Sequence, residues 1–258
     1  MLKQVLTTSL ALTSVLLGAG QSMAGSFFID NFDQPFDDIS QDISIGGAPP
    51  VTTGSNPDTK TLLPNTDVIG GSRTLSLAKR PGSNNAFTRA RVLPGITGDP
   101  NGSLAINNDD GVLSKTTLRW DGGNDVGLNS VGQGDLLTRL GTSNGRFGIN
   151  FNSLTLGKFD ATITISDGTK TKSVSINDLV GSTTYNQFLL SDFASGMDAV
   201  NLRNVRYIEL VLDGDSASAA DIDSFRMYEI PEPSALAGSI FALGLGVTFL
   251  RRRQENND

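Results

Sequence analysis

The chain has 258 residues, a net charge of −7, and neither cysteine nor histidine. The lack of histidine excludes Ser-His-Asp and Cys-His nucleophilic sites and the usual zinc and copper ligand sets, and the lack of cysteine excludes disulfides. Because no cluster of Lys and Arg occurs before the last eight residues, a nucleic-acid partner is not expected.

The N-terminus has the pattern of a secretory signal peptide. Lys3 is the only charged residue before Asp30, an apolar segment covers residues 10–18, and Ser22-Met23-Ala24 fits the small-x-small rule for signal peptidase. The pattern predicts export, with cleavage between Ala24 and Gly25. A membrane anchor or a buried helix is the alternative, but the apolar segment is short for an anchor.

Alternation of apolar and polar residues with period two dominates the middle of the chain. It predicts strands rather than helices, with an Asp-Gly turn at Asp167-Gly168 joining two of them in a hairpin. The expected strands are 26–32, 72–78, 112–120, 136–140, 147–151, the hairpin 160–178, 187–190, 206–212 and 222–227. Residues 33–65 contain several prolines and are expected to form a long surface connection with room for one short edge strand.

These strands, with turn residues at short spacing between them, predict an all-β domain over residues 25–230. We expect an antiparallel β-sandwich, in the form of a jelly roll of about eight to ten strands. An immunoglobulin-like sandwich is the second possibility.

The C-terminus combines Pro231-Glu232-Pro233, an uncharged stretch at 234–250 and the cluster Arg251, Arg252 and Arg253. The stretch of 17 residues is at the lower limit for a transmembrane helix, and the arginines are expected on its cytoplasmic side. Residues 231–253 resemble the PEP-CTERM sorting signal of bacterial envelope proteins. The resemblance implies an exosortase, a membrane protease that cuts near Pro-Glu-Pro and releases the protein to the cell surface. A plain membrane anchor is the alternative.

Two segments in the middle carry a second resemblance. Gly70–Leu77, and Gly111–Ser114 leading to Leu118–Gly122, are similar to a recurrent exported β-domain of proteins with this same tail. That likeness supports the sandwich and implies no activity.

Two patterns suggest catalysis and are weak. Gly141-Thr142-Ser143-Asn144-Gly145 matches the Gly-x-Ser-x-Gly pattern of hydrolases, but that motif needs a following helix and a histidine, so a hairpin turn is expected. Glu209 and Glu229 are the only glutamates before the tail and could form a glycosidase pair. Alternation instead places Glu209 on a solvated strand face, and no catalytic residue is predicted.

Aspartates near both ends of the domain suggest a structural calcium ion, which prefers oxygen ligands. Asp30, Asn31 and Asp33 belong to the first strand, Asp221 and Asp223 to the last, and terminal strands of jelly rolls often lie side by side. Loops 107–111 and 121–125 are alternative sites, whereas the loop from Asp213 does not fit an EF-hand. Asx turns also explain these residues, and no cofactor is predicted.

A carbohydrate site is the remaining hypothesis, with the candidate aromatic residues Trp120, Tyr185, Tyr207 and Tyr228. Trp120 fits a core strand as well as a binding face. The leading interpretation is an exported, non-enzymatic protein of structural or adhesive type at the cell surface or in the extracellular matrix. The alternative is a carbohydrate-binding module or a carboxylate-dependent glycan enzyme acting on exopolysaccharide. The expected partners are signal peptidase, the exosortase and, in the alternative, exopolysaccharide.

Overall fold

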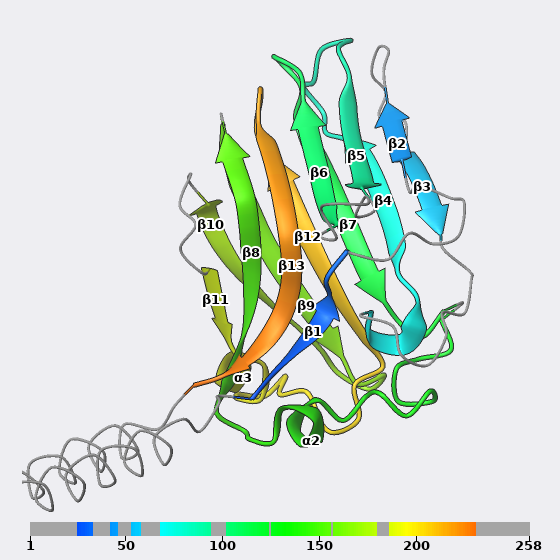
Figure 1. Cartoon of the computed structure of the whole chain (residues 1–258), viewed down its shortest axis with the longest axis vertical. Coiled ribbons are helices and arrows are strands. Elements are labelled where there is room, and N and C mark those ends of the chain that lie inside the picture. The colour runs from blue at the N-terminus through cyan, green and yellow to red at the C-terminus, as the bar shows by residue number, and fades with distance from the viewer. Residues whose placement is uncertain are drawn as a thin grey trace, which may run out of the picture. The chain divides into compact units, whose positions relative to one another are not determined.

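A computed structural model describes residues 25–32, 42–45, 53–57, 68–93, 102–123, 125–155, 157–179 and 186–230 (Figure 1). One compact unit spans Ser26–Glu229. The predicted signal peptide and the predicted sorting signal both lie outside the described residues. Within those ranges, no helix has the length and apolar character needed to cross a membrane.

Two antiparallel sheets form the domain, which confirms the prediction of an all-β sandwich. The seven-stranded sheet has the order β11, β8, β13, β6, β5, β2, with β1 also paired to β13. Its strands are β1 (Ser26–Asp30), β2 (Asp42–Ile45), β5 (Thr88–Leu93), β6 (Ser103–Asn108), β8 (Gly145–Thr155), β11 (Asn186–Leu189) and β13 (Ala219–Glu229). The six-stranded sheet has the order β10, β9, β12, β7, β4, β3. Its strands are β3 (Thr53–Pro57), β4 (Thr74–Lys79), β7 (Ser114–Trp120), β9 (Phe159–Ser166), β10 (Thr171–Leu179) and β12 (Tyr207–Gly214).

The core lies between the two sheets and follows from the alternation along the strands. In β12, for example, Ile208, Leu210 and Leu212 are fully buried while the residues between them are half-exposed. Side chains one residue apart point to opposite faces of a strand, so one face of each sheet is apolar. The aromatic centre of the core joins Trp120 to Phe225, with ring centroids 5.3 Å apart.

The predicted hairpin is confirmed: β9 and β10 pair from Ser166↔Thr171 to Phe159↔Leu179. The strand expected at 136–140 is wrong, because this segment is the helix α2 (Leu136–Leu140). The Asp135 carboxylate accepts a hydrogen bond from the Thr138 amide at its start, and Gly141 ends it with φ of 81°. Capping at both ends therefore prevails over the strand-like composition.

Sequence alternation missed β5 and β6, and residues 33–65 contain two strands, β2 and β3, rather than one. In β5 the buried residues Ala90 and Val92 are small and alternate with Arg89 and Arg91, so the apolar period is weak. The remaining helical segments are short: η1 (Ile69–Gly71) and α3 (Leu190–Phe193).

Candidate functional site

Trp120 belongs to the core and not to a binding face. Its side chain is fully buried, its ring packs on Phe225, and its Nε1 donates a hydrogen bond of 2.9 Å to Asp30 Oδ2. The sugar-binding role considered for Trp120 is therefore wrong.

Asp30 is also buried, and its carboxylate is fully used inside the protein. Arg73 Nη1 lies 2.6 Å from Oδ1 and 2.7 Å from Oδ2, and the Phe32 amide donates to Oδ1 at 2.9 Å. Together with the Trp120 bond, these contacts tie β1 to β7 and to the residue before β4. Burying a carboxylate without such partners would lower the stability of the fold by roughly several kcal/mol. The cluster of Asp30, Arg73 and Trp120 is therefore a structural element of the core.

The calcium hypothesis for the terminal strands does not fit this arrangement. The two strands do pair, from Ser26↔Tyr228 to Asp30↔Phe225. However, Asp30 turns into the core, while Asp221 and Asp223 lie on the opposite, outer face of β13, and Asp33 lies outside the described residues. No group of three acidic side chains that could hold a metal ion occurs in the described ranges.

In the two alternative calcium loops, aspartate oxygens accept hydrogen bonds from the protein itself, and loop 121–125 forms one of the Asx turns that the sequence also allowed. In loop 121–125, Asp121 accepts from the Gly123 amide at 3.0 Å and from Arg119 at 3.3 Å. In loop 107–111, Asp109 accepts from the Phe87 amide at 2.9 Å. Both Asp121 and Asp109 are therefore engaged in hydrogen bonds within the protein.

Neither catalytic pattern is assembled into a site. Glu209 lies in β12 of the six-stranded sheet, half-exposed, and Glu229 ends β13 of the seven-stranded sheet, so no shared face brings the two carboxylates together. Gly141–Gly145 connects α2 to β8 and is therefore not the hairpin turn expected. A strand follows the exposed Ser143, where a nucleophile elbow requires a helix.

The outer face of the seven-stranded sheet gathers the charged and aromatic side chains that could bind a ligand. We call it the β13 face, because β13 runs through its centre between β8 on one side and β6 and β1 on the other (Figure 1). Strand register aligns its residues in rows that cross the sheet: Arg146 with Tyr228 and Ser26, Gly148 with Arg226 and Phe28, Asn150 with Ser224, and Ser153 with Asp221, Ala105 and Arg91.

At one end of the β13 face, arginines and aromatic rings alternate. The Arg146 guanidinium carbon lies 5.9 Å from the centroid of the Tyr228 ring, and that of Arg226 lies 5.5 Å from the same ring. Arg226 also lies 4.5 Å from the centroid of Phe28, whose side chain is 38% exposed. All of these distances are within the range of cation–π attraction. We call Arg146, Tyr228, Arg226 and Phe28 the arginine–aromatic ladder.

A hydrogen-bonded polar group continues the face along β13. Asp223 Oδ2 accepts from Asn150 Nδ2 at 2.7 Å and from Ser224 Oγ at 3.0 Å. Arg226 donates to Ser224 Oγ through Nη2 at 2.7 Å and reaches Asp223 at only 3.5 Å. A shift in strand register between Ile222 and Ser224 places Asp223 in this group, as β-bulges commonly re-aim a side chain.

The next row consists of Arg91, Ala105 and Asp221, and it contains two polar atoms that the described part of the chain leaves without a hydrogen bond. Arg91 Nε and Asp221 Oδ1 are buried and have no hydrogen-bond partner among the described residues, and neither side chain forms a salt bridge there. Register places the small Ala105 between them. A buried polar atom without a partner costs about 1–3 kcal/mol, so this row is under-satisfied unless a further group binds on it.

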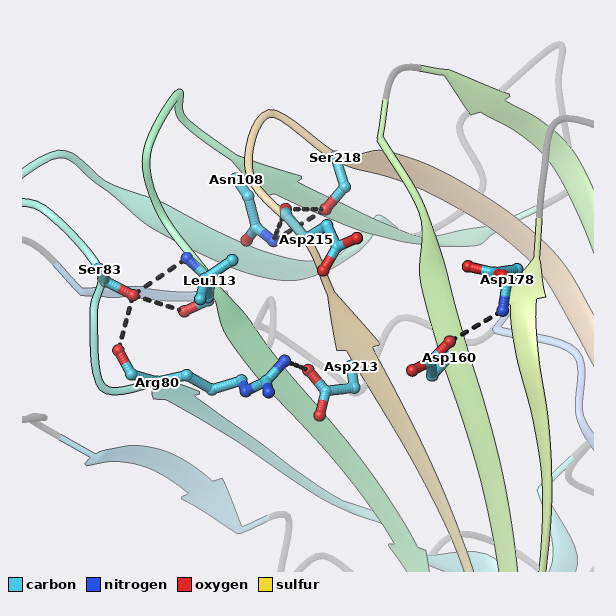
Figure 2. A network of polar contacts seen from close by, with 9 residues as sticks. All are labelled: Arg80, Ser83, Asn108, Leu113, Asp160, Asp178, Asp213, Asp215 and Ser218. Atoms are coloured by element: carbon cyan, nitrogen blue, oxygen red, sulfur yellow. Dashed lines mark hydrogen bonds and ion pairs between the residues drawn. The ribbon is translucent and has the colours of Figure 1, made fainter.

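Other polar contacts join neighbouring strands elsewhere in the sandwich (Figure 2). Arg80 pairs with Asp213, Asp160 accepts from the Asp178 amide at 2.8 Å, and Lys158 pairs with Asp178 at 2.9 Å. Partial burial raises the pKa of Asp213; Arg80 opposes this rise and Asp160 adds to it. These contacts give structural roles to Asp160, Asp178 and Asp213.

Tyr207, another of the predicted aromatic candidates, lies on the outer face of the six-stranded sheet. The Arg119 guanidinium carbon lies 4.1 Å from its ring centroid, but Arg119 also forms salt bridges with Asp121 and Asp125. The strands beside it present hydroxyl pairs, such as Thr164 with Ser173 at 2.8 Å. Arg119 and these hydroxyls therefore pair within the face, and Tyr185, the remaining candidate, lies outside the described residues.

Comparison with known proteins gives fold-level likenesses only. No protein-family model and no curated protein matches the sequence. One similar solved structure is the family 11 carbohydrate-binding module of the cellulosomal cellulase Lic26A-Cel5E of Clostridium thermocellum, with 10% identity, a TM-score of 0.35, and 82% of this chain and 98% of that chain covered. Another is TmCBM61 in complex with β-1,4-galactotriose, with 13% identity, a TM-score of 0.29, and 69% and 88% covered. The agarase AgWH50C matches at 16% identity and a TM-score of 0.30, with 52% of this chain and 22% of that chain covered. Because these scores and identities are low, none of these proteins indicates what this chain binds.

Proposed function

We propose that the protein is an exported, non-enzymatic protein of the cell surface or extracellular matrix that binds polysaccharide through the β13 face. Carbohydrate binding is preferred to a purely structural role because of one observation, the row Arg91–Ala105–Asp221. Neighbouring hydroxyls of a sugar can donate to a carboxylate and accept from a guanidinium at the same time. A glycan lying on this row would therefore supply hydrogen-bond partners to Arg91 Nε and Asp221 Oδ1.

The rest of the β13 face supports this assignment. Asn150 and Asp223 add amide and carboxylate groups beside the row, and Phe28 adds an exposed apolar ring. These polar and aromatic groups project from strands, and sites built on rigid strands keep their geometry without a ligand.

The chain passes repeatedly from one sheet to the other, for example from β6 to β7 and then to β8. This alternation between sheets is in keeping with the jelly roll that we propose as the connectivity of the fold.

We further propose that the protein has no catalytic activity. Glu209 and Glu229 lie in different sheets, and the chain contains no histidine to serve as a base. For the terminal segments, we propose export by a signal peptide cleaved after Ala24. We also propose transient membrane insertion through residues 234–250 and release at Pro231–Pro233 by an exosortase. This part of the proposal rests on the sequence pattern and its resemblance to PEP-CTERM signals.

A glycan array with the purified full chain in mild detergent tests the binding proposal, followed by titration against the glycans retained. We expect Asp221→Asn and Arg91→Gln each to weaken binding about ten-fold, because hydrogen bonds to charged groups contribute roughly 1.5–3 kcal/mol. Glu209→Gln is the matched control, since it removes one strand-borne charge from the other sheet, and its affinity should equal that of the wild type. Absence of binding to any glycan, or equal affinity of all four proteins, would favour the purely structural role.

A further inference from the structure

Strand β10 forms one edge of the six-stranded sheet (Figure 1). It pairs with β9 on one side, and no other strand of the described residues pairs with it. With nine residues, it is longer than the other edge strands, β3 with five residues and β2 and β11 with four each. Proteins usually keep exposed edges short, because unpaired backbone groups can pair with a strand of another molecule. Among these edges, β10 is therefore the one best suited to add a strand.

The register of the β9–β10 hairpin shows which backbone groups face outward. The Asp167 amide donates to the Lys170 carbonyl at 3.1 Å, so these two residues form a hydrogen-bonded pair. In an antiparallel ladder such pairs alternate with pairs that do not bond each other. Up to the bulge after Ile176, the even-numbered residues of β10 therefore bond to β9. The residues whose amides and carbonyls face the open edge are Thr171, Ser173 and Ser175.

The side chains of β10 leave this edge accessible. Ser173 Oγ forms a hydrogen bond of 2.8 Å with Thr164 Oγ1 of β9, so the serine side chain is directed toward β9. Lysines often protect edge strands by lying on them. Here, however, Lys172 Nζ donates to the Ser195 carbonyl at 2.5 Å, which holds this lysine on the segment after α3.

We infer that two copies of the protein associate by antiparallel pairing of their β10 strands across a two-fold axis. In this register Ser173 lies opposite Ser173 of the second copy, and Thr171 lies opposite Ser175, so that all three outward-facing residues are paired. The pairing joins two six-stranded sheets into one continuous sheet. The bulge after Ile176 interrupts the alternation and limits the pairing to the part of β10 before it.

A second copy of β10 matches this edge in chemistry and charge. The three outward-facing residues all carry hydroxyls, so pairing of identical strands extends the row of hydroxyl contacts that already joins Ser173 to Thr164. Hydroxyl pairs across neighbouring strands stabilise a sheet. On the other side of the strand, Lys172 comes opposite Val174 of the second copy and not opposite another lysine. Like charges therefore do not face each other in this register.

The dimer would leave the β13 face open, because that face belongs to the seven-stranded sheet. Pairing through one edge strand buries little surface, so we expect a weak and reversible contact. Two copies held together would present two β13 faces, and linked binding sites raise the overall affinity for a repeating ligand. The inferred dimer goes beyond the proposed glycan binding and does not depend on it.

Disulfide cross-linking tests the pairing without interference, because the chain has no cysteine of its own. In the inferred register the two Ser173 Cα atoms are about 5.5 Å apart, a distance that a disulfide can span. The full-length Ser173→Cys variant, oxidised in mild detergent, should therefore form a linked dimer. Ser143→Cys, at an exposed serine between α2 and β8, is the matched control and should cross-link at least about ten-fold less. Ser175→Cys should also remain unlinked, because the two Ser175 Cα atoms are roughly 13 Å apart along the strand.

Charge substitutions at Ser173 test the same contact without a covalent bond. Ser173→Lys and Ser173→Glu each place like charges opposite each other, and each should weaken dimerisation at least about three-fold in analytical ultracentrifugation. An equimolar mixture of the two variants should regain the dimer, because opposite charges then face each other. Ser173→Ala keeps the backbone pairing and should dimerise within about two-fold of the wild type. Thermal melting checks that each variant is folded.

Each outcome decides a separate part of the inference. If Ser173→Cys cross-links no more than Ser143→Cys and the wild type sediments as a monomer at every concentration, the inference is wrong. If Ser175→Cys cross-links in place of Ser173→Cys, the β10 strands pair and the Ser173-centred register is wrong. If all variants dimerise equally and the mixture gains nothing, the contact lies elsewhere in the chain and the β10 edge is not the interface.

Discussion

Replacing Asp30 by asparagine should destabilise the domain more than any substitution of a surface charge. Asp30 and Arg73 form an ion pair in which both side chains are completely buried. The asparagine would keep the volume and one acceptor oxygen, but it would remove the negative charge that Asp30 supplies to the buried Arg73 guanidinium. It would also place an amide nitrogen against a donor of Arg73 or Trp120.

The size of the effect follows from the burial. Breaking a buried ion pair by removing one partner typically costs about 3–5 kcal/mol, a large part of the roughly 5–15 kcal/mol that stabilises a typical domain. For a domain of this length, 1 kcal/mol shifts the melting temperature by roughly 2–4 °C. Asp30→Asn should therefore lower the melting temperature by about 6–20 °C.

Urea and thermal unfolding of three variants test this reasoning. Arg80→Gln removes a half-exposed arginine that pairs with Asp213 and should cost less than about 1 kcal/mol. The double variant Asp30→Leu with Arg73→Met removes both charges of the buried pair and should be more stable than Asp30→Asn, because the Arg73 charge is removed together with that of Asp30. If Asp30→Asn costs no more than Arg80→Gln, the view that the buried pair holds β1 in place is refuted.

Further predictions concern local turns and the terminal segments. Burial alone would raise the pKa of Asp167, but hydrogen bonds from its turn and from the Asn201 amide hold it far below its ordinary value of 3.8. Its charged form therefore stabilises the fold above that pH. Between pH 7 and pH 2, the free energy of unfolding should fall more steeply for the wild type than for Asp167→Asn. Parallel curves for the two proteins would contradict this. Asp135→Ala removes the N-terminal cap of α2 and should cost about 1 kcal/mol in chemical unfolding, whereas no change would show that the cap is dispensable. Mass spectrometry of envelope and culture fractions should find a C-terminus near Pro231–Pro233, and a surface form that retains Arg251–Arg253 would identify a plain anchor instead.

Sequence alternation predicted the strands in which large aliphatic residues alternate with polar ones. It failed in β5, where the inward residues are small, and at α2, where caps decide the structure. The position of Trp120 could have been predicted, since Trp120 has the same parity as the buried Leu118, and Arg119 and Thr117 point outward. The same rule places Tyr228 on the outer face of β13, because it follows the inward-pointing Met227.

The candidate site could not be predicted in the same way, because it depends on register between distant strands. Arg91 lies in β5 and Asp221 in β13, and these two strands are neighbours only through β6, which pairs with both. Two register shifts in β13, after Asp221 and after Ile222, then decide which residues share the outer face. Arginines at alternate positions in β5, and the Arg226-x-Tyr228 spacing in β13, were the available signals, but neither identifies its partners.

The pairing of β1 with β13 connects the fold to the proposed processing. Ser26 is opposite Tyr228, so the first strand after the predicted signal-peptidase site lies beside the last strand before Pro231. Both predicted cleavage points are thus within a few residues of paired strands, and the same pairing places Phe28 beside Arg226 in the ladder. Because β1 supplies both Asp30 to the core and Phe28 to the β13 face, a chain that loses β1 through cleavage a few residues too late should lose stability and binding together. Cleavage after Ala24 would retain the whole strand, because β1 begins at Ser26, and the proposed position is therefore compatible with the fold.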